Sequence, residues 1–248
     1  MSLALFMQST LIQLTSDIYF NMKILHISDT HGFHNDFPAS TWEGIDMVIH
    51  SGDCSNSGYL QQSILEITNF LNWYEMLPVA YKIFVAGNHD TAIARRAIKE
   101  ADIEKRGIIY LENESVNIEG LNIWGSPITP TFGDWSFMKA RDKTHEVWDQ
   151  IPEGTDIVVV HGPPKGIRDL SYDRQNNLEM CGDRSLAKRI EIINPQAMLF
   201  GHIHNCKDII NQGTSRHHGN RTLFSNGACV DDGRFDRGLT SFGNVIEL

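Results

Sequence analysis

Five short apolar runs punctuate the chain, and each ends abruptly in Asp, Asn or His residues. The third run, residues 81–86, leads into Gly87-Asn88-His89-Asp90. Apolar runs of this length are typical of strands that are buried on both faces of a sheet. In open α/β sheets, ligands bind beyond the C-terminal ends of such strands. The repeated pattern therefore predicts an α/β fold in which several strand ends supply one polar site.

The remaining chain divides into shorter predicted elements. The five runs are predicted as strands over residues 23–28, 46–50, 81–86, 156–160 and 197–200. Helices are predicted over 58–76, 91–106, 139–150 and 183–193, and in the second of these Ala97 and Ala101 are expected to face the core. Shorter β patterns predict an antiparallel meander over 108–111, 115–118 and 121–124, and tail strands near 207–211, 221–225 and 243–247. Residues 165–180 are predicted as a polar loop, and 212–220 as a hairpin loop with His217 and His218 at a solvated tip.

The polar residues at the five strand ends are of metal-ligand types. They are Asp29 and His31, Asp53, Asn88 and His89, His161, and His202 and His204. Carboxylate, amide and imidazole groups together suit first-row divalent ions. On an extended backbone, Asp29 and His31 would point the same way, as would His202 and His204, with Ile203 directed back to the core. The combined pattern predicts a site for two metal ions. His26 and His50 are interpreted as structural histidines.

Composition limits the partners of such a site. The net charge of -10 argues against broad binding of duplex nucleic acid or of an anionic membrane surface. An anionic substrate must therefore be attracted by a local positive centre, which two metal ions would supply. The four cysteines form no Cys-x-x-Cys pair, which favours a reducing compartment, and we expect a cytoplasmic protein.

The first residues differ from the rest of the chain. Residues 3–14 are mostly apolar, and no Lys or Arg precedes Lys23. The segment lacks a basic region and a clear cleavage site, and it is too short to span a bilayer. We expect residues 1–22 to be an N-terminal extension and residues 23–248 to form a single domain.

The motifs together resemble a known family. Five of them resemble the motifs of the calcineurin-like metallophosphoesterases, and the resemblance spans residues 23 to about 230. They are Asp29-x-His31, Gly52-Asp53, Gly87-Asn88-His89-Asp90, His161 and Gly201-His202-x-His204. Softer matches resemble the metallophosphoesterase-domain-containing (MPPED) branch, which is similar to class III cyclic nucleotide phosphodiesterases. They are Trp124-Gly-Ser-Pro-Ile-Thr-Pro, Ile151-Pro-Glu-Gly-Thr-Asp and His161-Gly-Pro-Pro-Lys-Gly.

This resemblance implies a four-layer α/β/β/α sandwich and two divalent ions, such as manganese, iron or zinc. One ion would be held by Asp29, His31, Asp53 and His204. The second would be held by Asp53, Asn88, His161 and His202, with Asp53 bridging the two. His89 would face the scissile phosphate, steadied by Asp90, and would protonate the leaving oxygen during in-line attack by a metal-bound hydroxide.

The loop over residues 125–138 is rich in Pro, Gly and aromatic residues. We interpret it as a substrate wall, with Trp135 joining Asn88 and His89 in substrate contact. The resemblance favours an enzyme that hydrolyses small phosphodiesters, cyclic nucleotides among them. A phosphomonoesterase, a nuclease and a metal-stabilised interaction scaffold are the alternatives, and the oligomeric state stays open.

Overall fold

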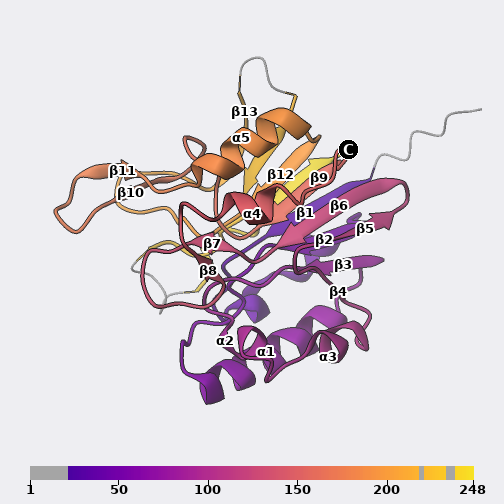
Figure 1. The fold of residues 1–248 in the computed structure, drawn as a ribbon. Coiled ribbons are helices and arrows are strands. Elements are labelled where there is room, and N and C mark those ends of the chain that lie inside the picture. Colours follow the sequence, from indigo (N-terminus) through magenta and orange to yellow (C-terminus); the bar gives the residue numbers. More distant parts are fainter. Residues whose placement is uncertain (1–21, 218–220, 233–237) are drawn as a thin grey trace, which may run out of the picture.

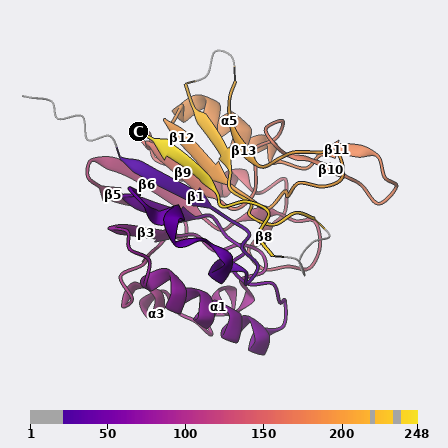
Figure 2. The same ribbon diagram turned by 180° about the vertical axis from the view of Figure 1, so that it is seen from behind.

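Two β-sheets pack face to face, and helices cover both outer faces (Figure 1). The structure, a computed structural model, describes residues 22–217, 221–232 and 238–248. The same four layers are seen from behind in Figure 2, with α1 and α3 on one outside and α5 on the other. The predicted α/β/β/α sandwich is therefore confirmed.

The first sheet has the strand order β15-β1-β2-β3-β4. Its strands are β1 (Lys23–Ile27), β2 (Met47–His50), β3 (Tyr81–Phe84), β4 (Ile109–Tyr110) and β15 (Asn244–Glu247). Strands β1 to β4 run parallel to one another, and β15 pairs antiparallel with β1. The strands β1, β2 and β3, which precede Asp29, Asp53 and Asn88, therefore end at the same edge of the sheet.

The second sheet has the order β13-β14-β12-β9-β6-β5. Its strands are β5 (Glu114–Ile118), β6 (Leu121–Ser126), β9 (Ile157–Val160), β12 (Ala197–Phe200), β13 (Gly213–Arg216) and β14 (Leu223–Asn226). The central strands β6, β9, β12 and β14 are parallel, and the edge strands β5 and β13 are antiparallel.

The helices cover the outer faces of the two sheets (Figure 1). On the first sheet they are α1 (Leu60–Glu75), α2 (Thr91–Ala94) and α3 (Glu100–Glu104), and on the second they are α4 (His145–Trp148) and α5 (Arg184–Ile193). Short elements complete the chain: two 3-10 turns (His34–Asp36, Ala39–Trp42), the pair β7 (Thr129–Pro130) and β8 (Met138–Lys139), and the hairpin of β10 (Leu170–Tyr172) and β11 (Leu178–Met180). Among the described residues, no helix is long and apolar enough to cross a membrane.

Alternation along the buried strands builds three apolar layers. In β9, Ile157 and Val159 face the other sheet, whereas Val158 and Val160 face α4 and α5. In β2, Met47 and Ile49 face the second sheet, and Val48 faces α1. Because successive side chains of a strand point to opposite faces, a strand with helices on one side and a sheet on the other is apolar throughout. This explains why the strands appear in the sequence as unbroken apolar runs.

The predicted helix over 91–106 is wrong in its middle. It is two short helices, α2 and α3, separated by a turn in which Arg96 has a φ of 57°. The backbone amides of Ala97 and Ile98 both bond to the carbonyl of Ala92, which closes the first helix. Asp102 then bonds the amide of Lys99 and begins the second helix. As a result Ala97 and Ala101 are exposed, whereas Ile93 and Ile98, which the same helical pattern also predicts to face the core, are buried together with Ile103.

Several other predicted boundaries are also corrected. Strand β4 pairs in parallel with β3 in the first sheet, so only β5 and β6 form the expected antiparallel pair. The predicted polar loop over 165–180 contains the β10–β11 hairpin, whose turn is bonded by the Asp173 carboxylate. The first tail strand is β13, later than 207–211, because Lys207 with a φ of 45° lies in a tight turn. The helix over 139–150 is limited to α4.

Residues 1–21 lie outside the described residues, and the division of the chain at residue 22 stays a prediction. Met22 itself is buried in the core between the sheets. Its amide donates to the carbonyl of Leu248 over 2.9 Å. The described residues at the two ends of the chain therefore lie side by side at one end of the first sheet.

Candidate metal centre

Five strand ends converge on one buried polar cluster between the two sheets. The loops after β1, β2 and β3 bring residues of the first sheet, and the loops after β9 and β12 bring residues of the second. The seven predicted metal ligands all lie in this cluster, and most of them are buried. They are Asp29, His31, Asp53, Asn88, His161, His202 and His204.

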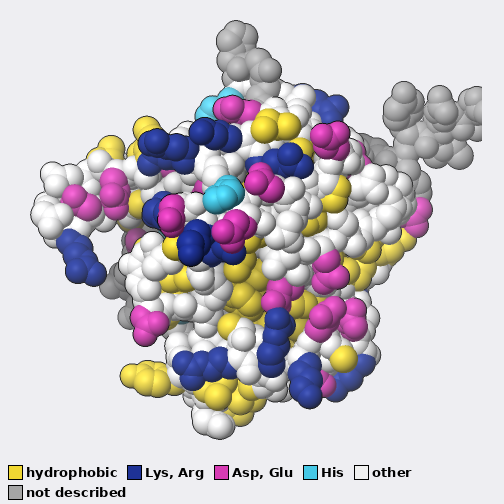
Figure 3. All heavy atoms as spheres, viewed as in Figure 1, with side chains coloured by type: hydrophobic (Ala, Val, Ile, Leu, Met, Phe, Trp, Pro, Cys, Tyr) yellow, Lys and Arg dark blue, Asp and Glu magenta, His cyan; other side chains and the backbone are white. Residues whose placement is uncertain are grey.

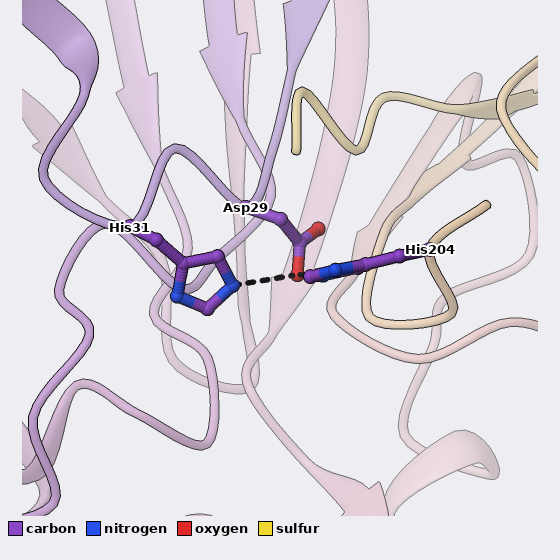
Figure 4. Close-up of side chains that lie close together, drawn as sticks. All are labelled: Asp29, His31 and His204. Carbon is purple, nitrogen blue, oxygen red and sulfur yellow. Dashed lines mark hydrogen bonds and ion pairs between the residues drawn. The ribbon is translucent and has the colours of Figure 1, made fainter. Parts of the chain in front are cut away.

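The first group of ligand atoms surrounds the Asp29 carboxylate (Figure 4). The Nε2 atom of His204 lies 2.9 Å from Oδ1 of Asp29, and Nε2 of His31 lies 3.9 Å from the same oxygen. One ligand atom from each of the three residues lies within 4.8 Å of the others. The two histidines approach the carboxylate from opposite sheets, so the site closes only when the sheets are stacked.

The second group surrounds the Asp53 carboxylate. Asp53 Oδ2 lies 3.2 Å from Nε2 of His161, and the same Nε2 lies 3.0 Å from the side-chain oxygen of Asn88. His202 completes the group, with ligand atoms of Asp53, His161 and His202 within 4.8 Å of one another. Asp53 also belongs with His31 and His89 to a third such set. Its position between groups is what a bridging carboxylate requires.

Backbone carbonyls fix which ring nitrogen of two histidines faces the centre. The Nδ1 atom of His161 lies 2.9 Å from the carbonyl oxygen of Ser51, and Nδ1 of His31 lies 3.2 Å from that of Ser55. A carbonyl only accepts, so Nδ1 donates in both rings, and in the neutral imidazole that binds a metal Nε2 is the atom whose lone pair faces the cluster. Metal-bound histidines are commonly held in this way. The donor set of imidazole, carboxylate and amide therefore fits two divalent ions.

Charge supports the same interpretation. Burial raises the pKa of the Asp29 and Asp53 carboxyl groups, but nearby histidines outweigh it and hold both values below the usual range. Burial lowers the pKa of His31 to about 4 and of His202 to about 3. Burial also acts on His161, but Asp53 outweighs it and raises that pKa to about 9. The centre thus holds two ionised, buried carboxylates, which need positive partners that divalent ions would supply.

The expected extended backbone at the paired ligands is wrong. Asp29, His31, Asp53 and His202 all have positive φ values, of 50°, 42°, 55° and 68°. These left-handed conformations, rather than strand alternation, turn the side chains into the cluster. Such conformations cost free energy in residues other than Gly and are typical of functional sites. Ile203 is correspondingly only half-buried and does not return to the core.

Two glycines allow the ligand loops to touch. A Cβ atom on Gly201 would lie 2.0 Å from Oδ2 of Asp29, and one on Gly87 would lie 2.2 Å from Oδ1 of Asp53. Both distances are far below van der Waals contact. Each glycine directly precedes a predicted ligand, His202 or Asn88, so these Gly-containing motifs reflect packing against a carboxylate of a neighbouring loop.

His89 is aimed at the centre by a carbonyl rather than by Asp90. Its Nδ1 atom lies 2.8 Å from the carbonyl oxygen of Asn56, so Nδ1 donates and Nε2 faces Asp53 Oδ2 at 4.0 Å. Its backbone amide donates to Asp53 Oδ1 over 2.8 Å. The ring is partly exposed, unlike the buried ligands around it. This placement leaves Nε2 accessible to a bound molecule.

The predicted contact between Asp90 and His89 is therefore wrong. The buried Asp90 carboxylate accepts from the amides of Asp53, Ser55 and Gly87, over 2.7–3.1 Å, and from the Ser55 hydroxyl and the Cys54 thiol. Because these donors lie in the loops after β2 and β3, Asp90 holds the two loops together. It positions the loop that carries Asp53.

The loop over 125–138 flanks the centre on two sides. The Trp135 ring lies 4.4 Å from that of His89, and the Phe132 ring lies 5.0 Å from that of His202. Trp135 therefore borders His89, and its contact with a substrate stays a prediction. Phe132, Asn56 and the serine carbonyls were missed by sequence reasoning. Only the aromatic content of the loop could have indicated Phe132, and backbone carbonyls leave no sequence signal.

The histidines interpreted as structural have other partners. His26 bonds the hydroxyls of Ser225 and Ser51 over 2.7 and 2.9 Å. His50 bonds the Thr30 hydroxyl over 3.1 Å and accepts from the Gly52 amide. His217 is exposed, beside the Phe224 ring, and His218 lies outside the described residues.

Comparisons with known proteins agree with this geometry. A family model described as "Calcineurin-like phosphoesterase" matches residues 22–206. Metallophosphoesterase domain-containing protein 1 of Homo sapiens is 30% identical over 219 residues, which cover 78% of this chain and 64% of that protein. A UPF0046 protein of Caenorhabditis elegans is 29% identical over 239 residues, covering 89% of this chain and 80% of that protein.

Two further similarities are to a much longer protein and to a solved structure. "Probable rhamnogalacturonate lyase C" of Emericella nidulans is 32% identical over 195 residues, but the chain covers only 17% of that protein. The crystal structure of Phosphopantetheinyl Hydrolase (PptH) from Mycobacterium tuberculosis superposes with a TM-score of 0.57 at 14% identity, covering 91% of this chain and 96% of that one, and so supports the fold. From the motifs that meet in the buried cluster and from the family model that spans them, this chain belongs to the calcineurin-like phosphoesterase family.

Proposed function

We propose that the protein is a metal-dependent hydrolase of small phosphodiesters, cyclic nucleotides among them. One observation carries the proposal. Six of the seven predicted ligands fall in adjoining groups of close ligand atoms, Asn88 adjoins His161, and the Asp53 carboxylate belongs to two of the groups. A phosphoester needs positive charge around its oxygens and an activated water opposite its leaving group. When bound, two divalent ions such as Mn²⁺ supply both.

The side chains around the metal ions have separate roles in charge balance and in contact with the substrate. Two divalent ions carry about four positive charges, and the carboxylates of Asp29 and Asp53 neutralise about two of them. The centre therefore stays positive in a chain of net charge -10. His89 presents Nε2 to the space beside Asp53, where it can hydrogen-bond a phosphoryl oxygen or give a proton to the leaving oxygen. Asn88 adds a neutral oxygen, and Trp135 borders the same space over the His89 ring.

The surface and the cysteines support a small substrate in a reducing compartment. On the face shown in Figure 3, Lys and Arg side chains are interspersed with Asp and Glu, rather than gathered in a basic stripe that would suit duplex nucleic acid. All four cysteines are free thiols. These features support a cytoplasmic enzyme whose partner is a small phosphoester.

A metal-replacement assay tests the proposal. The purified protein is stripped with a chelator, checked by elemental analysis, and assayed with phosphodiester, phosphomonoester and cyclic nucleotide substrates after addition of Mn²⁺, Fe²⁺ or Zn²⁺. We expect the stripped protein to be inactive and a divalent ion to restore diester hydrolysis. Full activity in metal-free protein would contradict the proposal, and metal binding with no hydrolysis would indicate an interaction scaffold.

A further inference from the structure

A cavity of about 450 Å³ opens beside the metal centre and is lined by one of its predicted ligands, His202. Its volume lies within the range of small-molecule sites, about 300–1,000 Å³. We propose that this cavity, between Phe132 and the β10–β11 hairpin, is the specificity pocket of the enzyme and takes a planar, uncharged ring substituent of the phosphoester. The inference rests on the proposed function, because it needs a phosphate anchored at the metal centre.

The wall next to the centre is apolar. Pro163 and Ile203 line it, and each follows a predicted ligand closely in the chain. Phe132 lines the same wall, with its ring 5.0 Å from that of His202, and 49% of the residue is exposed. An aromatic ring with an open face offers a stacking surface for another ring. A substituent that leaves a phosphate beside His202 would meet this surface first.

The opposite wall is the hairpin, which projects from the body of the molecule (Figures 1 and 2). Tyr172 supplies a second aromatic ring there. The Lys207 ammonium lies 4.4 Å from the centre of that ring and also bonds Asn176 in the hairpin turn. Ser171 and Gln175 add groups that can donate or accept hydrogen bonds. The far end of the cavity therefore suits the polar edge of a ring.

The hairpin is anchored to the metal centre at its base. The buried Asn211 side chain donates to the carbonyls of Leu170 and His204, each over 2.8 Å. The buried Asp169 carboxylate accepts from the amides of Gly166 and Gly182 over 2.9 and 3.0 Å. Because one amide group joins the hairpin to the loop of a metal ligand, the distance from the centre to the far wall is fixed by the fold.

The charges of the cavity are balanced, which argues against a second phosphate as its occupant. Two arginines, Arg141 and Arg174, and two acidic residues, Asp173 and Glu179, line the cavity. The Arg141 guanidinium already donates to the carbonyls of Cys181 and Gly182. An anion would gain little there, whereas an uncharged ring between Phe132 and Tyr172 would bury apolar surface.

Binding of two simple phosphonates tests this pocket without requiring turnover. Phenylphosphonate and methylphosphonate carry the same anionic head, so both are titrated calorimetrically into the Mn²⁺-loaded protein. We expect the wild-type protein to prefer phenylphosphonate by about tenfold, a typical scale for one well-packed aromatic contact. Phe132→Ala and, on the opposite wall, Tyr172→Ala should each reduce this preference to about threefold or less while methylphosphonate affinity stays within about twofold.

Leu178→Ala is the matched control, because Leu178 lies on the same hairpin, is exposed and does not line the cavity. It should keep the full preference. Equal affinity of the wild-type protein for the two phosphonates, failure to bind either one, or a preference that survives both aromatic substitutions would overturn the pocket assignment. Hydrolysis is scored separately: a protein that selects phenylphosphonate but cleaves no ester retains the pocket and refutes the proposed function.

Discussion

At the scale of single residues, the role of each histidine follows from the atom that holds its ring. His31 and His161 are held at Nδ1 by carbonyls and are enclosed with carboxylates. His89 is also held at Nδ1 by a carbonyl, but it is partly exposed and lies under Trp135. The difference in exposure suits His31 and His161 to metal binding and His89 to contact with substrate.

Replacing His89 should separate these roles. We expect His89→Ala to retain two metal ions per chain and to lose kcat by roughly 10²–10⁴-fold, the usual scale for a positioned acid. The loss should be largest for alkoxide leaving groups and smaller for nitrophenolate, which needs little protonation. His31→Ala is the comparison. It should lose metal and lower kcat by the same factor for both types of substrate. The same metal loss in His89→Ala would place His89 among the ligands.

Asp53 should be the most sensitive ligand, because its carboxylate lies among three histidines from different loops, His31, His89 and His161. Asp53→Asn removes negative charge between two cations and should lower metal content below two per chain. Since altering groups that only support a ligand already costs about 10–100-fold, we expect Asp53→Asn to lower kcat/KM by more than about 10²-fold and by more than His31→Ala. Two bound metals with near-normal turnover would show that Asp53 does not bridge.

At the scale of elements, His26 joins the two sheets below the metal centre. It lies on β1 and bonds Ser225 on β14, with Ser51 after β2 as its other partner. Burial lowers the pKa of His26 to about 3, from an ordinary value of 6.5. Between these values the unfolded chain binds a proton that the folded protein excludes. Stability is therefore unaffected by this group above pH 6.5 and falls as the pH drops below it.

The pH dependence of stability tests this role of His26 between the two sheets. One excluded proton corresponds to about 1.4 kcal/mol of unfolding free energy per pH unit. In chelator-treated protein, His26→Gln should reduce the slope of unfolding free energy against pH by about that amount between about pH 5.5 and 4.5. Ser225→Ala, which removes a partner but no titrating group, should lower stability with little change of slope. An unchanged slope in His26→Gln would show that His26 is protonated in the folded protein.

At the scale of the whole molecule, the metal centre connects the two halves of the sandwich. Asp29, His31, Asp53 and Asn88 come from the first sheet, and His161, His202 and His204 come from the second. A ligand that binds only the folded state stabilises it, by about 2.7 kcal/mol at a hundredfold excess over its dissociation constant. Metal should therefore hold the sheets together as well as serve the reaction.

Thermal unfolding measures this contribution. Adding Mn²⁺ to chelator-treated protein should raise Tm by about 5–10 °C, because about 1 kcal/mol shifts a chain of this size by about 2–4 °C. Asp53→Asn should lose most of the rise, whereas Leu178→Ala on the exposed hairpin should keep it. Equal Tm values with and without metal in the wild-type protein would mean that the ions do not bind this cluster.

The buried strands, and the residue types that follow them, could be predicted from the amino-acid pattern alone. A strand between a sheet and a helical layer must be apolar on both faces, so β1, β2, β3, β9 and β12 were visible as continuous runs. Glycines before Asp53, Asn88 and His202, together with the spacing of the polar residues, were enough to indicate the family and the seven side chains that meet in the cluster, whose binding of metal stays a prediction.

How those side chains converge could not be predicted in this way, because it depends on the assembled sheets and loops. Left-handed backbone at Asp29 and His202 replaces the expected alternation, and no local pattern encodes it, because packing against the facing loop stabilises it. Asp90 binds the amides of two loops instead of the His89 ring, since the stacked loops bring those donors closer. The β10–β11 hairpin and Phe132 were likewise hidden, because a cavity is formed by segments distant in sequence that meet only when the sheets and their loops are assembled.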